Sequence, residues 1–362
     1  MIGVTLWRYL FKRYVVMTGW FILGILAIIY MIDFTEFSNR ASELPGYTIS
    51  IGLLLSALRL PNIIQATMPF IILFASMSVL LVLNRKYELV VARSAGISAW
   101  QFLSPLCAAS FLIGVFMVTA VNPLSSVALS SVQEMEHGIG MQRGTVGTIE
   151  RTPWIRQRTN EGITIIGAKT IARRGLLLGQ ATFIRFNDEG GIAERLDARE
   201  ALLENEHWVL TDIVRVSRNS PPESVERLEI ATNLKPEFVE ESLASPQSIS
   251  FFALPRKIEV ARSFGLGANA FAMQYQSLLA LPLLLVAMTL IAANVSLRFI
   301  RFGQSGTVIL AGILAGFLLY VVTVLTKSFG TAGVVPPIVA AWLPVIVASA
   351  LGVTVLLHKE DG

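Results

Sequence analysis

The sequence predicts an α-helical membrane protein with six transmembrane helices and one inserted, water-soluble all-β domain. Hydrophobic residues make up 54% of the 362 residues and charged residues only 15%, with a mean hydropathy of +0.63. A soluble domain carries about 25% charged residues. About two-thirds of the charges fall between residues 134 and 262, where short stretches alternate polar and apolar side chains. We therefore expect membrane parts at residues 1–140 and 257–362, with a β domain at 141–256 between them.

The N-terminal third is expected to hold surface helices as well as spans. Residues 1–13 are expected to form an interfacial helix, since Trp7 and Tyr9 alternate with basic residues. The first span is predicted at residues 14–32 and is expected to stay uncleaved, because no small-residue cleavage site follows its long apolar core. Residues 49–58 form an amphipathic segment expected on the membrane surface. The second span, at 61–83, contains Pro69, which predicts a kink.

Four further spans follow, at residues 102–121, 275–295, 308–325 and 337–357, each near the ~20 residues needed to cross a bilayer. A helical stalk follows the first of these. Six spans place both termini on one side, and cytoplasmic loops carry an excess of Lys and Arg. The terminal side would hold Arg8, Lys12, Arg13, Arg85, Lys86, Arg93, Arg298, Arg301 and Lys359, against Arg40, Arg59 and Lys327 opposite. We therefore expect cytoplasmic termini and a periplasmic β domain.

The inserted domain shows three runs that alternate with a period of two, at residues 163–169, 182–186 and 208–216. Turn-forming residues at 187–191 and 205–207 separate them, so short antiparallel strands are predicted. The apolar members of these runs are candidates for one inner face, which either forms an open groove or fills a closed core. These candidates are Ile163, Ile165, Phe183, Phe186 and Trp208.

A charged island at residues 84–96 separates the second and third spans. A helical wheel places Tyr87, Val90 and Val91 on one side and the basic residues on the other, with Leu89 among the basic residues and directed outward. Gly96 suits the helix end, and Ser98 with Gln101 suits a capping box for the next helix. A short surface helix is expected, and an ordinary basic loop is the alternative. The residues singled out are Arg85, Tyr87, Glu88, Leu89, Val91, Arg93 and Gly96.

No catalytic, cofactor-binding or metal-binding motif is found in the sequence. It contains no G-x-x-x-x-G-K-[ST] loop and no G-x-S-x-G elbow, and its three histidines lack metal-ligand spacing. The single cysteine, Cys107, lies in an apolar run and cannot form an intrachain disulfide. If this protein does work, we expect the energy to come from a partner.

Several short motifs occur in the order found in one known family. Glu-Leu-Val-Val at 88–91 precedes Ala-Gly at 95–96 and Trp-Gln at 100–101; Leu-Pro at 60–61 and Met-Pro-Phe at 68–70 come before them. The chain ends with Gly-Val-Val-Pro-Pro at 333–337 and Ala-Trp-Leu-Pro at 341–344. This order resembles the lipopolysaccharide export permeases, the LptF/LptG family, and the ending is more similar to LptG than to LptF.

The resemblance implies a transmembrane subunit of an ATP-driven exporter that extracts lipopolysaccharide from the inner membrane. It implies an LptF-like sister subunit, an LptB-like ATPase dimer and LptC- or LptA-like periplasmic β-jellyroll proteins as partners. The charged island would be the ATPase-coupling helix, with Glu88 at the family's acidic position and Leu89 filling an apolar notch. The inserted domain would be a β-jellyroll.

The resemblance also implies that the first and fifth spans of each subunit line a substrate cavity between the two subunits. Gly306, Gly312 and Gly316 form a small-residue face that lets another helix approach closely, either the partner's first span or a helix of the same chain. Rim positions of this cavity would be Tyr30, Asp33, Phe37, Arg40 and Lys327. The alternative function is a membrane-anchored periplasmic scaffold without transport, for which one anchoring helix would be enough.

Overall fold

The structure is a computed structural model that describes residues 3–42, 47–138, 154–159, 162–172, 176–186, 191–204, 207–217, 221–232, 246–263, 268–296 and 305–360. It divides into two compact units. The membrane unit contains residues 1–142, 246–255 and 269–362, and the β unit contains 143–245 and 256–268. The expected domain boundary near 256 falls inside helix α7 (Leu254–Ser263).

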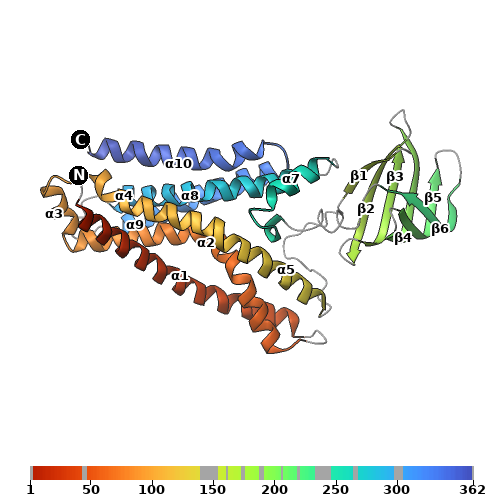
Figure 1. The fold of residues 1–362 in the computed structure, drawn as a ribbon, viewed down its shortest axis with the longest axis horizontal. Coiled ribbons are helices and arrows are strands. Elements are labelled where there is room, and N and C mark those ends of the chain that lie inside the picture. Colours follow the sequence, from red (N-terminus) through yellow and green to blue (C-terminus); the bar gives the residue numbers. More distant parts are fainter. Residues whose placement is uncertain are drawn as a thin grey trace. The chain divides into compact units, whose positions relative to one another are not determined.

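Six helices of the described chain are long and apolar enough to cross a membrane. They are α1 (Val4–Ala41), α2 (Ile49–Arg85), α4 (Ala99–Phe116) with its continuation, α8 (Asn269–Ser296), α9 (Ser305–Thr331) and α10 (Pro337–Glu360). Both chain termini and the short helix α3 (Glu88–Ser94) lie at the same end of this unit (Figure 1). The six predicted spans are thus confirmed.

The separate surface helices expected in the N-terminal third are not found. Residues 1–13 do not form a helix of their own, because α1 runs unbroken from Val4 to Ala41. The amphipathic segment at 49–58 and the second span are likewise one helix, α2, which continues through Pro61 and Pro69. Burial of Leu10 and Tyr14 fixes the start of α1 against the bundle.

The third span leads directly into the predicted helical stalk. Helix α4 passes through a π-helical turn, Met117–Val121, into α5 (Asn122–Gly138). Asn122 lies at the junction, where its side-chain oxygen accepts a hydrogen bond of 2.7 Å from the backbone N–H of Phe251. This bond attaches the chain returning after residue 245 to the base of the stalk.

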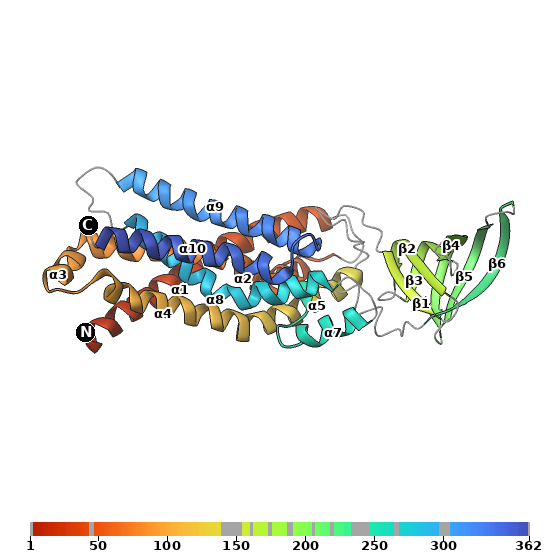
Figure 2. The same ribbon diagram turned by 90° about the horizontal axis from the view of Figure 1, so that it is seen from above.

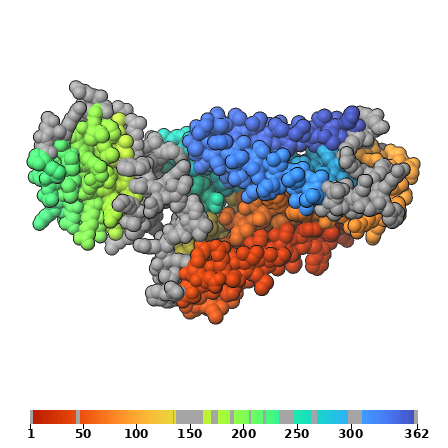
Figure 3. Space-filling view, turned by 180° about the vertical axis from the view of Figure 1, so that it is seen from behind, coloured from red at the N-terminus to blue at the C-terminus, as the bar shows by residue number. Residues whose placement is uncertain are grey.

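The helices of the membrane unit differ sharply in the share of their residues that is buried by the rest of the chain. In their most apolar stretches, 61% of the residues of α2, 50% of α4 and 56% of α8 are buried. The share is 33% for α10, 11% for α9 and 6% for α1. Figure 3 shows α1 (red) and α9 (blue) on the surface of this unit. Helices α2, α4 and α8 therefore form its core.

The described residues of the β unit form a six-stranded antiparallel sheet in which every strand pairs with the next one in sequence. Figure 2 shows the sheet as strongly curved. Its strands are β1 (Trp154–Thr159), β2 (Gly162–Ala172), β3 (Leu177–Phe186), β4 (Ile192–Glu204), β5 (His207–Ser217) and β6 (Glu223–Ala231). A jellyroll needs Greek-key connections between non-consecutive strands. The all-β insert is confirmed, and the jellyroll shape is not.

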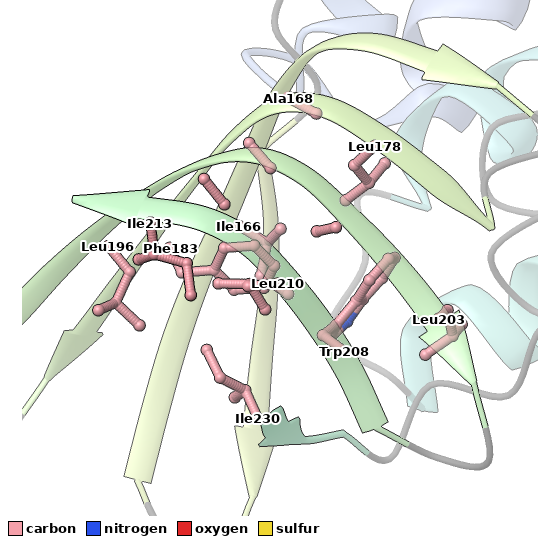
Figure 4. Packing of buried hydrophobic residues seen from close by; sticks show 13 residues of the cluster. Ile166, Ala168, Leu178, Phe183, Leu196, Leu203, Trp208, Leu210, Ile213 and Ile230 are labelled. Atoms are coloured by element: carbon pink, nitrogen blue, oxygen red, sulfur yellow. The ribbon is translucent and has the colours of Figure 1, made fainter. Parts of the chain in front are cut away.

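The inner face of this sheet is occupied by one apolar cluster around Phe183 and Trp208, both fully buried (Figure 4). Their rings meet edge to face with centroids 6.1 Å apart. Ile163, Ile165 and Phe186 were expected on this face, and that was wrong. Phe183 pairs with Ile166 across the strands, whereas Ile163 pairs with Phe186. Since neighbours in a strand point to opposite faces, these three residues lie on the other face, half-buried.

Some residues used in the predictions lie outside the described part of the chain. The turn residues 187–190 and 205–206 fall there, as do Arg298 and Arg301 and the side chain of Lys359. The expected boundary at residue 141 also lies in an undescribed stretch, residues 139–153.

Candidate functional site

Helix α3 lies between α2 and α4, and backbone breaks define both of its ends. Tyr87 precedes it in the left-handed region with a φ of +59°, and Gly96 follows it with a φ of +77°. Gly96 is thus the expected stop, because only glycine adopts this conformation without a steric penalty. The Ser98 hydroxyl accepts a hydrogen bond of 3.3 Å from the N–H of Gln101, so the expected cap of α4 is confirmed.

The structure corrects the orientation of Leu89. This side chain is only 6% exposed and faces the bundle, so it is not the outward apolar residue. Tyr87 and Val91 are 64% and 65% exposed and take that place. A helical wheel that treats residues 84–96 as one helix places the side chains of α3 on the wrong sides. Helix α2 ends at Arg85, and α3 begins at Glu88 in a new direction after the break at Tyr87. Arg85 is exposed and Arg93 is half-buried.

Glu88 is held against the first turns of α1. Arg13 Nη1 donates to both carboxylate oxygens of Glu88 at 3.0 Å. The Tyr9 hydroxyl donates to Oε2 of the same carboxylate at 3.2 Å and accepts from Arg13 at 2.5 Å. This three-residue network joins α3 to a helix 75 residues earlier in the chain. A displacement of α3 would therefore pull on α1.

The expected rim residues on α1 form contacts with α2 and the stalk. Arg59 of α2 bonds Glu136 of α5, lies 3.5 Å from Asp33 Oδ2, and stacks 4.6 Å from the ring of Phe37. Phe37 is 1% exposed, so it is a core residue and not a rim residue.

The remaining expected rim residues, Tyr30, Arg40 and Lys327, each form a hydrogen bond or ion pair of their own. The Tyr30 hydroxyl donates to the Leu53 carbonyl at 3.2 Å, Arg40 pairs with Glu36 at 2.6 Å, and Lys327 donates to Gln274 at 3.2 Å.

The small-residue face of α9 packs inside its own chain. A Cβ atom at Gly312 would lie 2.7 Å from Met77 of α2, and one at Gly316 would clash with Leu73 of the same helix. These two glycines were expected to face a partner's first span. They face α2 of their own chain instead. They let α2 approach α9, which turns the large residues of α9 outward. Leu310, Leu314 and Leu318 are 65%, 65% and 63% exposed.

Comparison with known proteins agrees with this architecture. The family model described as "Lipopolysaccharide export system permease LptF/LptG" matches residues 8–358. The chain belongs to the LptF/LptG family. Two relatives are the proteins named "Lipopolysaccharide export system permease protein LptG" of Escherichia coli strain K12 and of Escherichia coli O6:H1 strain CFT073. Each is 21% identical over 355 residues, which cover 96% of this chain and 95% of the relative.

As a member of the LptF/LptG family, the chain is a multi-pass membrane permease of the lipopolysaccharide export system. Membership implies a non-catalytic membrane subunit that has partners from the same system. Two features of this permease were not found from sequence. Arg59 was counted only as a loop charge, although it joins α1, α2 and α5. Gly114 was not singled out, although it lies against the backbone of α8.

Proposed function

We propose that this chain is the LptG-like subunit of an ATP-driven exporter that extracts lipopolysaccharide from the outer leaflet of the inner membrane. It would pair with an LptF-like subunit and an LptB-like ATPase dimer, and deliver the lipid to periplasmic LptC- or LptA-like proteins. Both relatives named above carry the LptG name, which supports this role. A scaffold without transport would need one anchoring helix and not six.

One observation carries the proposal: two apolar spans, α1 and α9, are left almost uncovered by their own chain. Only 6% and 11% of the residues in their most apolar stretches are buried. Exposed side chains on α1 include Trp20, Leu23, Ile28 and Met31. An uncovered span contacts either lipid or another protein helix. We propose that α1 and α9 line the cavity between this subunit and its sister, which acyl chains enter from the bilayer.

Helix α3 is proposed to receive the force from the ATPase. Val91 of this helix and Tyr87 just before it are strongly exposed, and so is Arg85, two residues before Tyr87 in the chain. Aromatic and apolar residues at the centre of a contact, with charges around them, are typical of protein interfaces. The excess of basic residues at this end of the spans favours a cytoplasmic location, where the ATPase would lie.

The β unit is proposed to pass the lipid on by edge pairing. Strands β1 and β6 each have one neighbour in the described sheet, so their outer edges offer unpaired backbone groups to a partner's strand. The inner apolar face is filled by its own side chains in the free chain. Acyl chains would therefore reach it only when pairing opens the sheet.

A photo-crosslinking residue at Phe183 tests this route, with Val214 on the opposite face as the matched control. Val214 is 43% exposed and Phe183 is fully buried. ATP-dependent capture of lipopolysaccharide at Phe183 alone supports the inner route. Capture at Val214 alone means that the lipid travels along the outer face.

The cavity assignment is tested by disulfide crosslinking in the assembled complex. Leu314→Cys on the exposed face of α9 should crosslink to cysteines at mid-depth of the sister subunit's first span, and the crosslink should block export. Gly312→Cys is the matched control, because it lies two residues away and faces Met77 of its own chain. If Leu314→Cys joins no position of the sister subunit while the complex is intact, the cavity assignment is wrong.

A further inference from the structure

Four hydroxyl side chains from four different helices meet inside the membrane unit. The Tyr14 hydroxyl of α1 lies 2.7 Å from Ser110 Oγ of α4 and 3.0 Å from Ser76 Oγ of α2. Thr289 Oγ1 of α8 lies 2.6 Å from Ser110, 3.3 Å from Ser76 and 3.4 Å from Tyr14. All four residues are at most 1% exposed. We call these four residues the hydroxyl cluster.

The hydroxyl cluster fixes the four helices relative to one another. Lipid gives helices no hydrophobic reason to associate, so interhelical hydrogen bonds and close packing hold them together. Tyr14 and Thr289 each contact the three other hydroxyls, and Ser76 and Ser110 each contact two, so rotation or sliding of any one helix disrupts at least two of these contacts. The hydroxyls of Ser110 and Thr289 also lie 3.0 Å and 3.1 Å from the carbonyls of Leu106 and Leu285 in their own helices. The cluster therefore favours movement of α1, α2, α4 and α8 as one body.

This body contains the two helices that flank α3 in the chain and the helix that holds its Glu88 side chain. Helix α3 is joined through the chain to α2 on one side and to α4 on the other. Its Glu88 side chain is held by Arg13 of α1, and the next residue of α1 is Tyr14 of the cluster. No described residue of α9 or α10 donates to or accepts from the cluster. Helix α9 packs against α2 at Gly312 and Gly316 but shares no hydrogen bond with the cluster in the described chain, so we treat it as a separate element that can shift against this body.

We infer that Tyr14 is a positioning residue that transmits the displacement of α3 to the spans through the hydroxyl cluster. An ATPase that moves α3 moves α1, α2, α4 and α8 together, and the displacement appears as a shift relative to α9. This inference rests on the proposed function, since it takes the ATPase as the source of the movement.

The test measures a distance in the intact complex of this chain, its sister subunit and the ATPase. Spin labels are placed at Ile49 on α2 and at Val334 in the turn after α9, which are 66% and 73% exposed. Cys107 is first replaced by alanine, because it is the only native cysteine. In the otherwise unchanged complex, trapping with ATP and vanadate should alter the distance between the labels.

Tyr14→Phe removes only the hydroxyl and should reduce this ATP-dependent change by half or more. Thr289→Val should have the same effect. Thr18→Val is the matched control. Thr18 is also buried on α1, one turn further on, and its hydroxyl has no hydrogen-bond partner in the described chain. Its removal should leave the distance change unaltered. The lipid released per ATP hydrolysed should fall at least threefold in the two cluster variants and stay unchanged in Thr18→Val.

A Tyr14→Phe complex with the full distance change and the same lipid release per ATP would overturn the inference. If Tyr14→Phe fails to assemble, Ser76→Ala replaces it, because that change removes two of the longer bonds and leaves the contact between Ser110 and Thr289. The distance is measured without lipopolysaccharide. A complex that shows the distance change but releases no lipid would therefore contradict the proposed function and leave the role of Tyr14 standing.

Discussion

Glu88 and Arg13 form an ion pair with an N–O distance of 3.0 Å between the short helix α3 and the first turns of α1. The pair is partly open to solvent, with side-chain exposures of 32% and 20%. Such pairs contribute about 0–1 kcal/mol to stability. Its importance is therefore expected to be mechanical, because together with the Tyr9 hydroxyl it ties the proposed ATPase contact to the first span.

Replacing Glu88 by glutamine should leave folding nearly unchanged and lower ATP-driven lipid release several-fold. Exchanging the two charges, Arg13→Glu with Glu88→Arg, should recover more than half of the release lost in the worse single variant. Release from proteoliposomes is the measurement, and Glu36→Gln in the exposed pair with Arg40 is the control. If the exchanged pair exports no better than either single variant, the pair does not transmit force.

Gly114 lies where α4 and α8 touch, since a Cβ atom there would be 2.5 Å from the Cα of Pro282. The obstacle is backbone, so Gly114→Ala must push the two helices apart. Overpacking of this kind costs about 1–3 kcal/mol. Gly24→Ala on α1 meets nothing within 4 Å and should be neutral or stabilising by up to about 1 kcal/mol. Thermal unfolding in detergent compares the two, and equal midpoints would contradict the packing described.

Arg59 is shared by two carboxylates, those of Asp33 and Glu136, and its own side chain is 19% exposed. Arg59→Ala leaves both acids without this partner, and a buried polar group without a partner costs about 1–3 kcal/mol. Arg40→Ala removes only an exposed i,i+4 pair and should cost about 0.5 kcal/mol or less. Thermal unfolding of the detergent-solubilised protein should separate the two variants. Equal losses would mean that Arg59 does not hold the stalk to α1 and α2.

The two faces of the β unit should respond differently to truncation. Phe183→Ala empties a fully buried site and should cost about 3–5 kcal/mol. Ile163→Ala on the other face should cost about 1 kcal/mol, because a half-buried side chain loses only part of the roughly 1.5–3 kcal/mol of full burial. Hydrogen exchange of the β3–β5 amides in the intact protein measures both. A larger effect at Ile163 would reverse the assignment of the faces.

The spans and three of the strands could be predicted because their patterns are local. Apolar length predicts a span, and alternation predicts β2, β3 and β5. Strand β4 (Ile192–Glu204) was not predicted, since its many Ala, Glu, Arg and Leu residues are good helix formers. It becomes a strand because pairing with β3 and β5 buries Leu196, Ala198 and Ala201. This pairing lies outside any local window.

The position of the candidate site in the chain was predicted more accurately than the directions of its side chains. Glu88 was assigned to the right helix and Gly96 to its end, yet Leu89 was turned the wrong way because a left-handed Tyr87 resets the helical phase. The glycines of α9 were correctly expected to permit close approach, but a single sequence does not tell which helix approaches. Arg59 and the hydroxyl cluster depend on contacts between helices far apart in the chain, which no local pattern contains.

Lipid release by the reconstituted complex tests the central claim most directly. This chain, its sister permease and the ATPase are placed in proteoliposomes containing lipopolysaccharide, with a soluble periplasmic β-jellyroll protein outside as acceptor. We expect transfer of lipopolysaccharide to the acceptor that requires ATP and disappears when this chain is omitted. An intact complex that hydrolyses ATP and transfers no lipopolysaccharide would contradict the proposed function.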